Sequence, residues 1–241
     1  MSFNLAKLRA NIDTDACVKL AITAQKAEMF SDMVFIVKEL GNLAVREKRD
    51  LTSNERSLIA TAFKNIVGQQ RASRRVVWCE NREDVSVAYK QHIQDEMTSF
   101  CNDSISFFSS MKRHQTSMES SVFFTKMLAD FYRYLAEISM EENLPDFEEK
   151  RANALELYSQ AKALSEGKLH KAHPLWLGVA LNVAVCYYEL MKDRKQACKV
   201  AKNAFNEAIF RLDSLDELFY KDSTLLMQLI RDNLTAWTAE Q

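Results

Sequence analysis

Basic side chains recur at helical spacing in two largely apolar segments of this 241-residue chain. Lys64 and Arg71 are seven positions apart, which places them on one face of a helix. Arg133 and Tyr134 lie together in the segment DFYRYLAE of another helix. Like charges on one face repel each other unless an anion lies between them. Guanidinium forks, an ammonium group and a phenol hydroxyl match the oxygens of a phosphate, so we expect these four residues to bind one.

Two further polar pairs match the groups of a peptide backbone. Asn182 and Glu189 are seven positions apart, and Asn233 and Trp237 are four apart. Each asparagine offers a carbonyl and an amide group, which match the N–H and C=O groups of an extended peptide. Three apolar side chains, one or a few turns from the asparagines, would form a strip opposite the cations: Leu181, Val185 and Leu229. Such a groove suits a phosphorylated peptide.

Each pair taken alone has an ordinary explanation. Arginines on helix surfaces are commonly solvated, and asparagines in apolar helices are commonly satisfied structural groups. The inference depends on the joint occurrence of the pairs in alternate helices of one antiparallel array, where they would line one concave wall.

The elements that must position these residues are helices. The chain contains only four glycines and two prolines, so the turns of a strand-rich fold are missing. We expect an all-α protein of about nine antiparallel helices that form a concave superhelical cup, similar to tetratricopeptide arrays, in a single domain over residues 1–241. The expected helices cover approximately residues 13–28, 31–44, 52–77, 84–112, 119–140, 145–165, 174–192 and 196–212, followed by a last helix that carries Trp237.

Several helix starts are marked by capping residues. The sequence TSNE, from Thr52 to Glu55, is typical of a capping box, and SLDE, from Ser214 to Glu217, is a second match. Asp222 is a candidate cap of the last helix, and Pro174 suits the first position of the seventh.

Composition excludes several classes of function. The net charge of −1 gives no overall field for nucleic acid or an anionic membrane, and no apolar run is long enough to span a bilayer. The five cysteines form no CxxC pair, so we expect reduced thiols in a cytoplasmic protein. The four histidines form no strong metal set. We expect no metal site, no other cofactor and no catalytic residues.

Two alternatives to a phosphopeptide adaptor remain. A phosphate-handling enzyme is the first, but none of the five cysteines has the arginine six positions later that a cysteine phosphatase loop needs, and no GxxxxGK[ST] loop is present. The second is a tetratricopeptide-like scaffold that binds unphosphorylated peptides. The stretch LNVAVCYYELMKDRKQACKVAKNAFNEAI resembles one such hairpin, but no 34-residue repeat is sustained along the chain.

Long blocks of the sequence resemble the 14-3-3 proteins. They include NERSLIATAFKNIVGQQRAS, VFFTKMLADFYRYLAE, HPLWLGVALNVAVCYYEL and YKDSTLLMQLIRDNLTAWT, in the order of that family. The resemblance implies a nine-helix, dimeric adaptor that binds phosphoserine or phosphothreonine motifs, with N-terminal helices for dimerisation and C-terminal helices for the ligand groove. By position, the four phosphate-binding candidates match the phosphate pocket of the family. The peptide-groove positions match Lys126, Leu181, Asn182, Val185, Glu189, Leu229, Asn233 and Trp237.

The resemblance also implies a dimer interface, which here departs from the family pattern. The expected interface residues are Asp32, Ser73, Tyr89, His92 and Glu96. His92 replaces a lysine expected to pair with Asp32, and Met29 replaces an arginine whose carboxylate counterpart is retained as Glu96. Because histidine loses its charge near neutral pH, we expect a homo- or heterodimer that is weaker, pH-sensitive or differently arranged.

Overall fold

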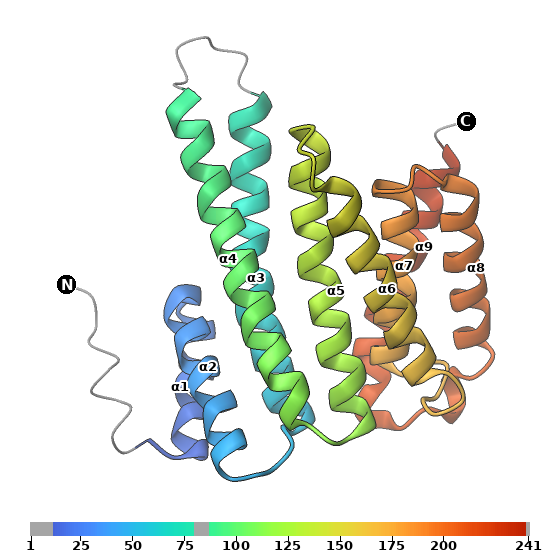
Figure 1. Ribbon diagram of the computed structural model, residues 1–241. Coiled ribbons are helices and arrows are strands. Elements are labelled where there is room, and N and C mark those ends of the chain that lie inside the picture. Colours follow the sequence, from blue (N-terminus) through green and yellow to red (C-terminus); the bar gives the residue numbers. More distant parts are fainter. Residues whose placement is uncertain (1–11, 80–86, 240–241) are drawn as a thin grey trace. The chain divides into compact units, whose positions relative to one another are not determined.

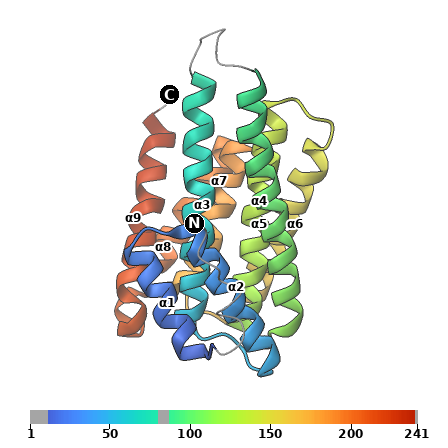
Figure 2. The same ribbon diagram turned by 90° about the vertical axis from the view of Figure 1, so that its left-hand side faces the viewer.

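The structure, a computed structural model, describes residues 12–79 and 87–239. Across these ranges the chain forms nine α-helices, one short 3-10 helix and no strand, which confirms the all-α prediction. The chain divides into two compact units, Met1–Ser120 and Ser121–Gln241. Figures 1 and 2 show the helices of each unit. The expectation of a single domain over residues 1–241 stays a prediction.

The first unit contains four helices, and each helix packs on its neighbours in sequence. Their bounds are α1 (Thr14–Lys26), α2 (Phe30–Arg46), α3 (Ser53–Cys79) and α4 (Val87–His114). These agree with the predicted ranges to within a few residues. The predicted start of the fourth helix at residue 84 lies outside the described residues.

Aromatic packing holds the long helices α3 and α4 together. The ring of Phe63 stacks on that of Phe107 with centroids 5.4 Å apart and lies 4.7 Å from that of Phe108. Helix α2 approaches this layer at Gly41, where an added Cβ atom would lie 3.0 Å from Sδ of Met111. Glycine at this position therefore allows a close helix–helix contact that a larger residue would push apart.

The predicted capping box at the start of α3 is confirmed. The Thr52 amide donates to Oε2 of Glu55 at 2.7 Å, and the Glu55 amide donates to Oγ1 of Thr52 at 3.3 Å. Arg49 adds a bidentate pair, with both terminal nitrogens 2.9 Å from the Glu55 carboxylate oxygens. Burial alone would raise the pKa of Glu55, but the hydrogen bonds from Arg49 and Thr52 outweigh it and lower that pKa.

The second unit contains the remaining helices, in which α7 contacts α6, α8 and α9. Their bounds are α5 (Met118–Glu141), α6 (Phe147–Ser165), α7 (Pro174–Glu189), α8 (Arg194–Ile209), the 3-10 helix η2 (Leu212–Ser214) and α9 (Glu217–Ala239). Pro174 occupies the first turn of α7 as predicted.

Two predictions about the start of the last helix were wrong. Helix α9 begins at Glu217, and the Asp216 side chain accepts the Leu218 amide at 2.9 Å, so Asp216 is the cap. Asp222 lies inside the helix. Ser214 ends the 3-10 helix, and its hydroxyl donates to the Arg211 carbonyl oxygen, which leaves no capping box with Glu217.

Helix ends in this glycine-poor chain use other residues in the left-handed conformation. Glu28, Lys48 and Asn143 have φ angles of 55°, 52° and 53° and follow α1, α2 and α5. After Lys48, the Arg49 amide donates back to the Ala44 carbonyl oxygen at 3.0 Å. Backbone bonds of this kind satisfy the last carbonyl groups of a helix and offset a strain of about 1–2 kcal/mol.

No helix in the described ranges is long and apolar enough to cross a membrane.

We predict that Glu55→Gln lowers the free energy of unfolding by about 1–3 kcal/mol at neutral pH, because charge-assisted bonds to Arg49 become neutral ones. A carboxyl group with a lowered folded pKa stabilises the fold above its unfolded pKa, and this stabilisation is lost as pH falls through the folded value. The variant should therefore lose less stability than the parent between about pH 5 and pH 3. Urea denaturation at several pH values measures this.

Glu47→Gln is the matched control. Glu47 accepts from Nε of the same Arg49 at 2.7 Å, but its side chain is 44% exposed. Exposed pairs contribute about 0.2–1 kcal/mol, so this variant should retain nearly all of the stability and the acid sensitivity of the parent. Equal effects of the two substitutions would contradict the role assigned to Glu55.

Candidate functional site

A buried carboxylate, Asp130 on α5, connects three helices of the second unit. Its side chain is almost fully buried, at 1% exposed. Lys126 Nζ donates to Oδ2 at 2.8 Å, while Tyr158 Oη and Asn182 Nδ2 donate to Oδ1 at 2.7 and 2.5 Å. These donors come from α5, α6 and α7. Asp130 therefore fixes the side chains of Lys126 and Asn182, two of the residues predicted from sequence.

Arg133, one turn further along α5, is also buried and is held on one side by hydrogen bonds. Its Nε donates to Tyr158 Oη at 3.2 Å, and its Nη1 donates to Glu189 at 3.0 Å and to Glu137. Its Nη2 takes no acceptor from the described part of the chain. The guanidinium carbon lies 4.7 Å from the centroid of the Tyr134 ring. One edge of the guanidinium group is thus anchored to the protein while the other remains for a ligand.

The charges within this network are stable at physiological pH. Burial alone would lower the pKa of Arg133, but the oxygens of Tyr158, Glu137 and Glu189 outweigh it and raise that pKa well above its ordinary value. Burial and the Asp130 charge likewise raise the pKa of Tyr158 well above its ordinary value. Arg133 therefore stays positive and the Tyr158 phenol stays neutral, so it donates to Asp130 and accepts from Arg133.

The spacing along the helices explains why these residues meet. Four charged residues on α5, at positions 126, 130, 133 and 137, share one face because they follow the three- and four-residue spacing of a helix. The same spacing aligns Asn182 and Glu189 on α7. Sequence reasoning missed Asp130, Glu137 and Tyr158. The pairs Lys126–Asp130 and Arg133–Glu137 were visible as residues four apart, but nothing in the sequence marked Tyr158.

Gly178 on α7 supports the position of Lys126. A Cβ atom added at Gly178 would lie 3.2 Å from Cε of Lys126. The lysine stem therefore lies directly against the backbone of α7, where a side chain would have to displace it. This contact places the ammonium group beside Asp130.

The remaining predicted groove residues of the second unit lie on α7 and α9. Trp237 is buried and its ring stacks on Tyr188 with centroids 4.9 Å apart and an angle of 16° between the planes. Leu181 is buried, Val185 and Asn233 are half-buried, and Leu229 is 44% exposed. Trp237 thus attaches the end of α9 to α7, the helix that also carries Asn182.

Lys64 and Arg71 lie in the first unit on α3. Lys64 is exposed and Arg71 is half-buried. Their neighbour Arg74 is buried, with its guanidinium carbon 4.5 Å from the centroid of the Trp78 ring. Arg74 is therefore part of a cation–π contact on its own helix. The meeting of Lys64 and Arg71 with Arg133 stays a prediction.

The residues expected at a dimer interface are on α2, α3 and α4. His92 Nε2 lies 3.5 Å from a carboxylate oxygen of Glu96, one turn further along α4. The Tyr89 ring is 51% exposed and lies 6.3 Å from the His92 ring. Asp32 is half-buried and Ser73 is exposed. Contacts of these residues with a second copy stay predictions.

Residues 20–238 match the family model described as "14-3-3 protein". The chain belongs to the 14-3-3 family. It is similar to "14-3-3 protein 7" of Solanum lycopersicum, with 40% identity over 234 residues, or 92% of this chain and 90% of the relative. It is 38% identical over 239 residues to "14-3-3 protein beta/alpha" of Gallus gallus, which covers 95% of each chain.

Proteins of the 14-3-3 family are adaptors rather than enzymes. The protonation of two buried thiols also disfavours a role for them as nucleophiles of a cysteine phosphatase. Burial raises the pKa of both Cys17 and Cys186 to about 11, so these thiols are protonated at neutral pH and are poor nucleophiles. No cluster of three metal-ligating side chains exists among the described residues.

We predict that Tyr158→Phe lowers the free energy of unfolding by about 1–3 kcal/mol, because it leaves Asp130 and Arg133 buried with one partner fewer each. Urea denaturation measures this change. The matched control is Tyr132→Phe on α5, since no hydrogen bond of its half-buried side chain is found in the described ranges. If the two variants lose the same stability, the Tyr158 hydroxyl is not a bridge between the charges.

Proposed function

We propose that this chain binds protein segments that carry phosphoserine or phosphothreonine, and that it acts as an adaptor that regulates such clients in signalling. Membership of the 14-3-3 family supports this function. The main structural support for this function is Arg133. Its guanidinium group is buried and permanently charged, and its Nη2 edge remains for an anion.

The proposed phosphate ligands are Arg133 and Tyr134 of the second unit, together with Lys64 and Arg71 of the first. The family pattern and the shared helix face of Lys64 and Arg71 support the second pair. Hydrogen bonds to charged groups contribute about 1.5–3 kcal/mol each, so three or four give roughly 5–10 kcal/mol before ordering costs. Micromolar affinity requires about −8 kcal/mol, so loss of the phosphate would remove most of the binding.

The proposed contacts to the peptide backbone come from two asparagines. Asn182 uses its Nδ2 group for Asp130, which leaves its carbonyl oxygen to accept a peptide N–H. Asn233 would provide the second contact. Further groove residues in this proposal are Lys126, Leu181, Val185, Glu189, Leu229 and Trp237.

We further propose that the chain works in the cytoplasm as a homo- or heterodimer through α1 to α4, with no catalytic activity of its own. A tetratricopeptide-like scaffold would instead bind peptides with or without phosphate. An enzyme would turn over chromogenic phosphate esters.

We predict that a phosphoserine peptide binds with micromolar or better affinity and that its unphosphorylated twin binds at least about a hundredfold more weakly, because about 3 kcal/mol or more comes from the phosphate. Isothermal titration calorimetry measures both. Lys64→Glu and Arg133→Ala should abolish detectable binding. Arg75→Glu is the control for charge, since Arg75 is an exposed residue of the same helix as Lys64. Equal affinity for the two peptides would reject the adaptor mechanism.

We predict that His92→Lys tightens the dimer roughly two- to tenfold, because a permanent positive charge then stands at the position expected to face Asp32 of a second copy. Sedimentation equilibrium at one fixed pH and ionic strength measures the dissociation constants. His114→Lys, at the exposed end of α4, makes the same change outside the expected interface and should leave the constant unchanged. Equal constants for the parent chain and His92→Lys would refute the role of His92.

A further inference from the structure

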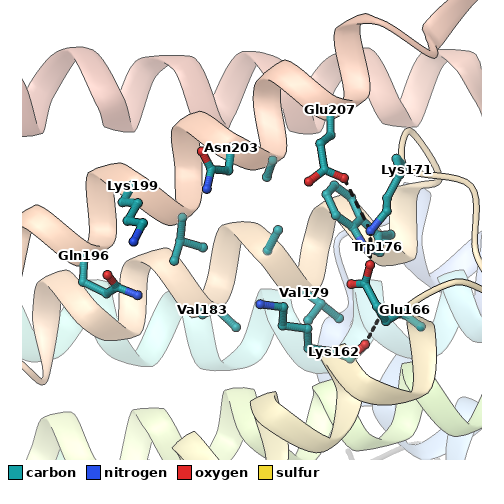
Figure 3. A pocket seen from close by; sticks show the side chains of 14 residues that line it. Lys162, Glu166, Lys171, Trp176, Val179, Val183, Gln196, Lys199, Asn203 and Glu207 are labelled. Carbon is teal, nitrogen blue, oxygen red and sulfur yellow. Dashed lines mark hydrogen bonds and ion pairs between the residues drawn. The ribbon is translucent and has the colours of Figure 1, made fainter.

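An open cavity of about 540 Å³ lies between α6, α7 and α8 in the second unit, and it contains none of the residues assigned to phosphopeptide binding. Figure 3 shows its floor on α7 and its walls on the two neighbouring helices. Its volume is typical of sites for small organic molecules. Its lining includes Lys162, Lys171, Trp176, Val179, Val183 and Lys199.

The floor of the cavity is apolar. Val179 is 2% exposed, and Val183 follows it by one turn of α7. Val200 and Ala204 on α8 also line the space. A hydrocarbon or aromatic group would cover the half-buried side chains of Val183 and Val200 and remove their remaining apolar surface from water, which favours binding.

One end of the cavity is closed by a lysine side chain whose charge is already paired with carboxylates of the protein. Lys171 pairs with Glu166, lies 3.4 Å from Glu207, and places its ammonium nitrogen 4.6 Å from the centroid of the Trp176 ring. Its side chain is 15% exposed. Both carboxylates of the cavity are thus engaged by one lysine, which disfavours a cationic ligand at this end (Figure 3).

The other part of the rim carries two lysines without such partners. Lys162 comes from α6 and Lys199 from α8, and they lie on opposite sides of the α7 floor (Figure 3). Neither forms an ion pair in the part of the chain that the structure describes, but the charge of Lys162 acts on Glu166 from a distance and contributes to the lowered pKa of that carboxyl group. The side-chain amide of Gln196 lies beside Lys199 and offers a further donor. Two cations above an apolar floor are complementary to a molecule with one anionic end and one apolar end.

We propose that this cavity binds a small anionic amphiphile. A carboxylate, sulfonate or phosphate head lies between Lys162 and Lys199, and the apolar body covers Val179 and Val183 and extends toward Trp176. A free inorganic anion would leave the floor exposed to water, and a neutral apolar molecule would make no use of the two lysines. The lining of this cavity shares no residue with the proposed phosphopeptide site.

The test uses anilinonaphthalene sulfonate, an aromatic anion whose fluorescence rises in apolar surroundings, with N-phenylnaphthylamine as its uncharged counterpart. Fluorescence titration of the full chain gives the dissociation constants. The double variant Lys162→Glu, Lys199→Glu should weaken binding of the sulfonate roughly tenfold or more, because two attractive charges become repulsive. Binding of the uncharged probe should change less than about twofold.

The matched control is the double variant Lys168→Glu, Lys202→Glu. Both lysines are exposed, lie outside the cavity lining and give the same change of net charge. This variant should bind the sulfonate within about twofold of the parent. An equal weakening by both double variants, or no weakening by the first, would overturn the proposal. All four positions are exposed, so circular dichroism should show the parent's helix content in each variant.

Competition identifies the preferred head group and body. Decanoate should displace the sulfonate probe from the parent chain at a lower concentration than decanol, because it combines a carboxylate with a hydrocarbon body, whereas sodium acetate should not displace the probe. Displacement by decanol as effective as that by decanoate would contradict the role of the lysines. Displacement by acetate, which has no hydrocarbon body, would contradict the role of the apolar floor.

Discussion

Two opposite charges buried within one turn of each other impose the main constraint on the second unit. Asp130 and Arg133 are both nearly excluded from water, and an unpaired buried charge costs several kcal/mol. The Tyr158 hydroxyl bonds to both, donating to the carboxylate and accepting from the guanidinium group. The α6 helix must therefore lie beside α5 in one register, and the packing of Tyr158 with Ala129, Ala136 and Cys186 follows from it.

The same network orders the groups that we propose face the ligand. Lys126 and Asn182 each use one donor group for the protein, and Arg133 uses Nε and Nη1, which fixes the direction of the remaining donors or acceptors. Side chains that are ordered before binding lose less conformational entropy when a ligand arrives. A cavity rim made of exposed lysines, such as Lys162 and Lys199, lacks this advantage, and its affinity must come largely from the apolar floor.

Local rules explain much of the fold. The scarcity of glycine and proline predicted helices, and residues 52 to 55 marked the start of α3 because a capping box requires only contacts within one turn. The same rule failed at residues 214 to 217, because Ser214 ends a 3-10 turn and bonds to the carbonyl oxygen of Arg211. A capping motif thus depends on the conformation of the chain that precedes it, which four residues do not specify.

The sequence by itself determined the helices and which side chains share a face, because both follow from interactions between residues three or four apart. It therefore indicated Arg133, Asn182 and Glu189 as candidate site residues, and through its long matching blocks it identified the family and indicated Lys126. Only the tertiary structure revealed Tyr158 as the link between buried charges and Lys171 as the closing residue of a cavity. Their partners include residues 28 and 36 positions away, and contacts at such separation arise from the packing of whole helices, which no local pattern encodes.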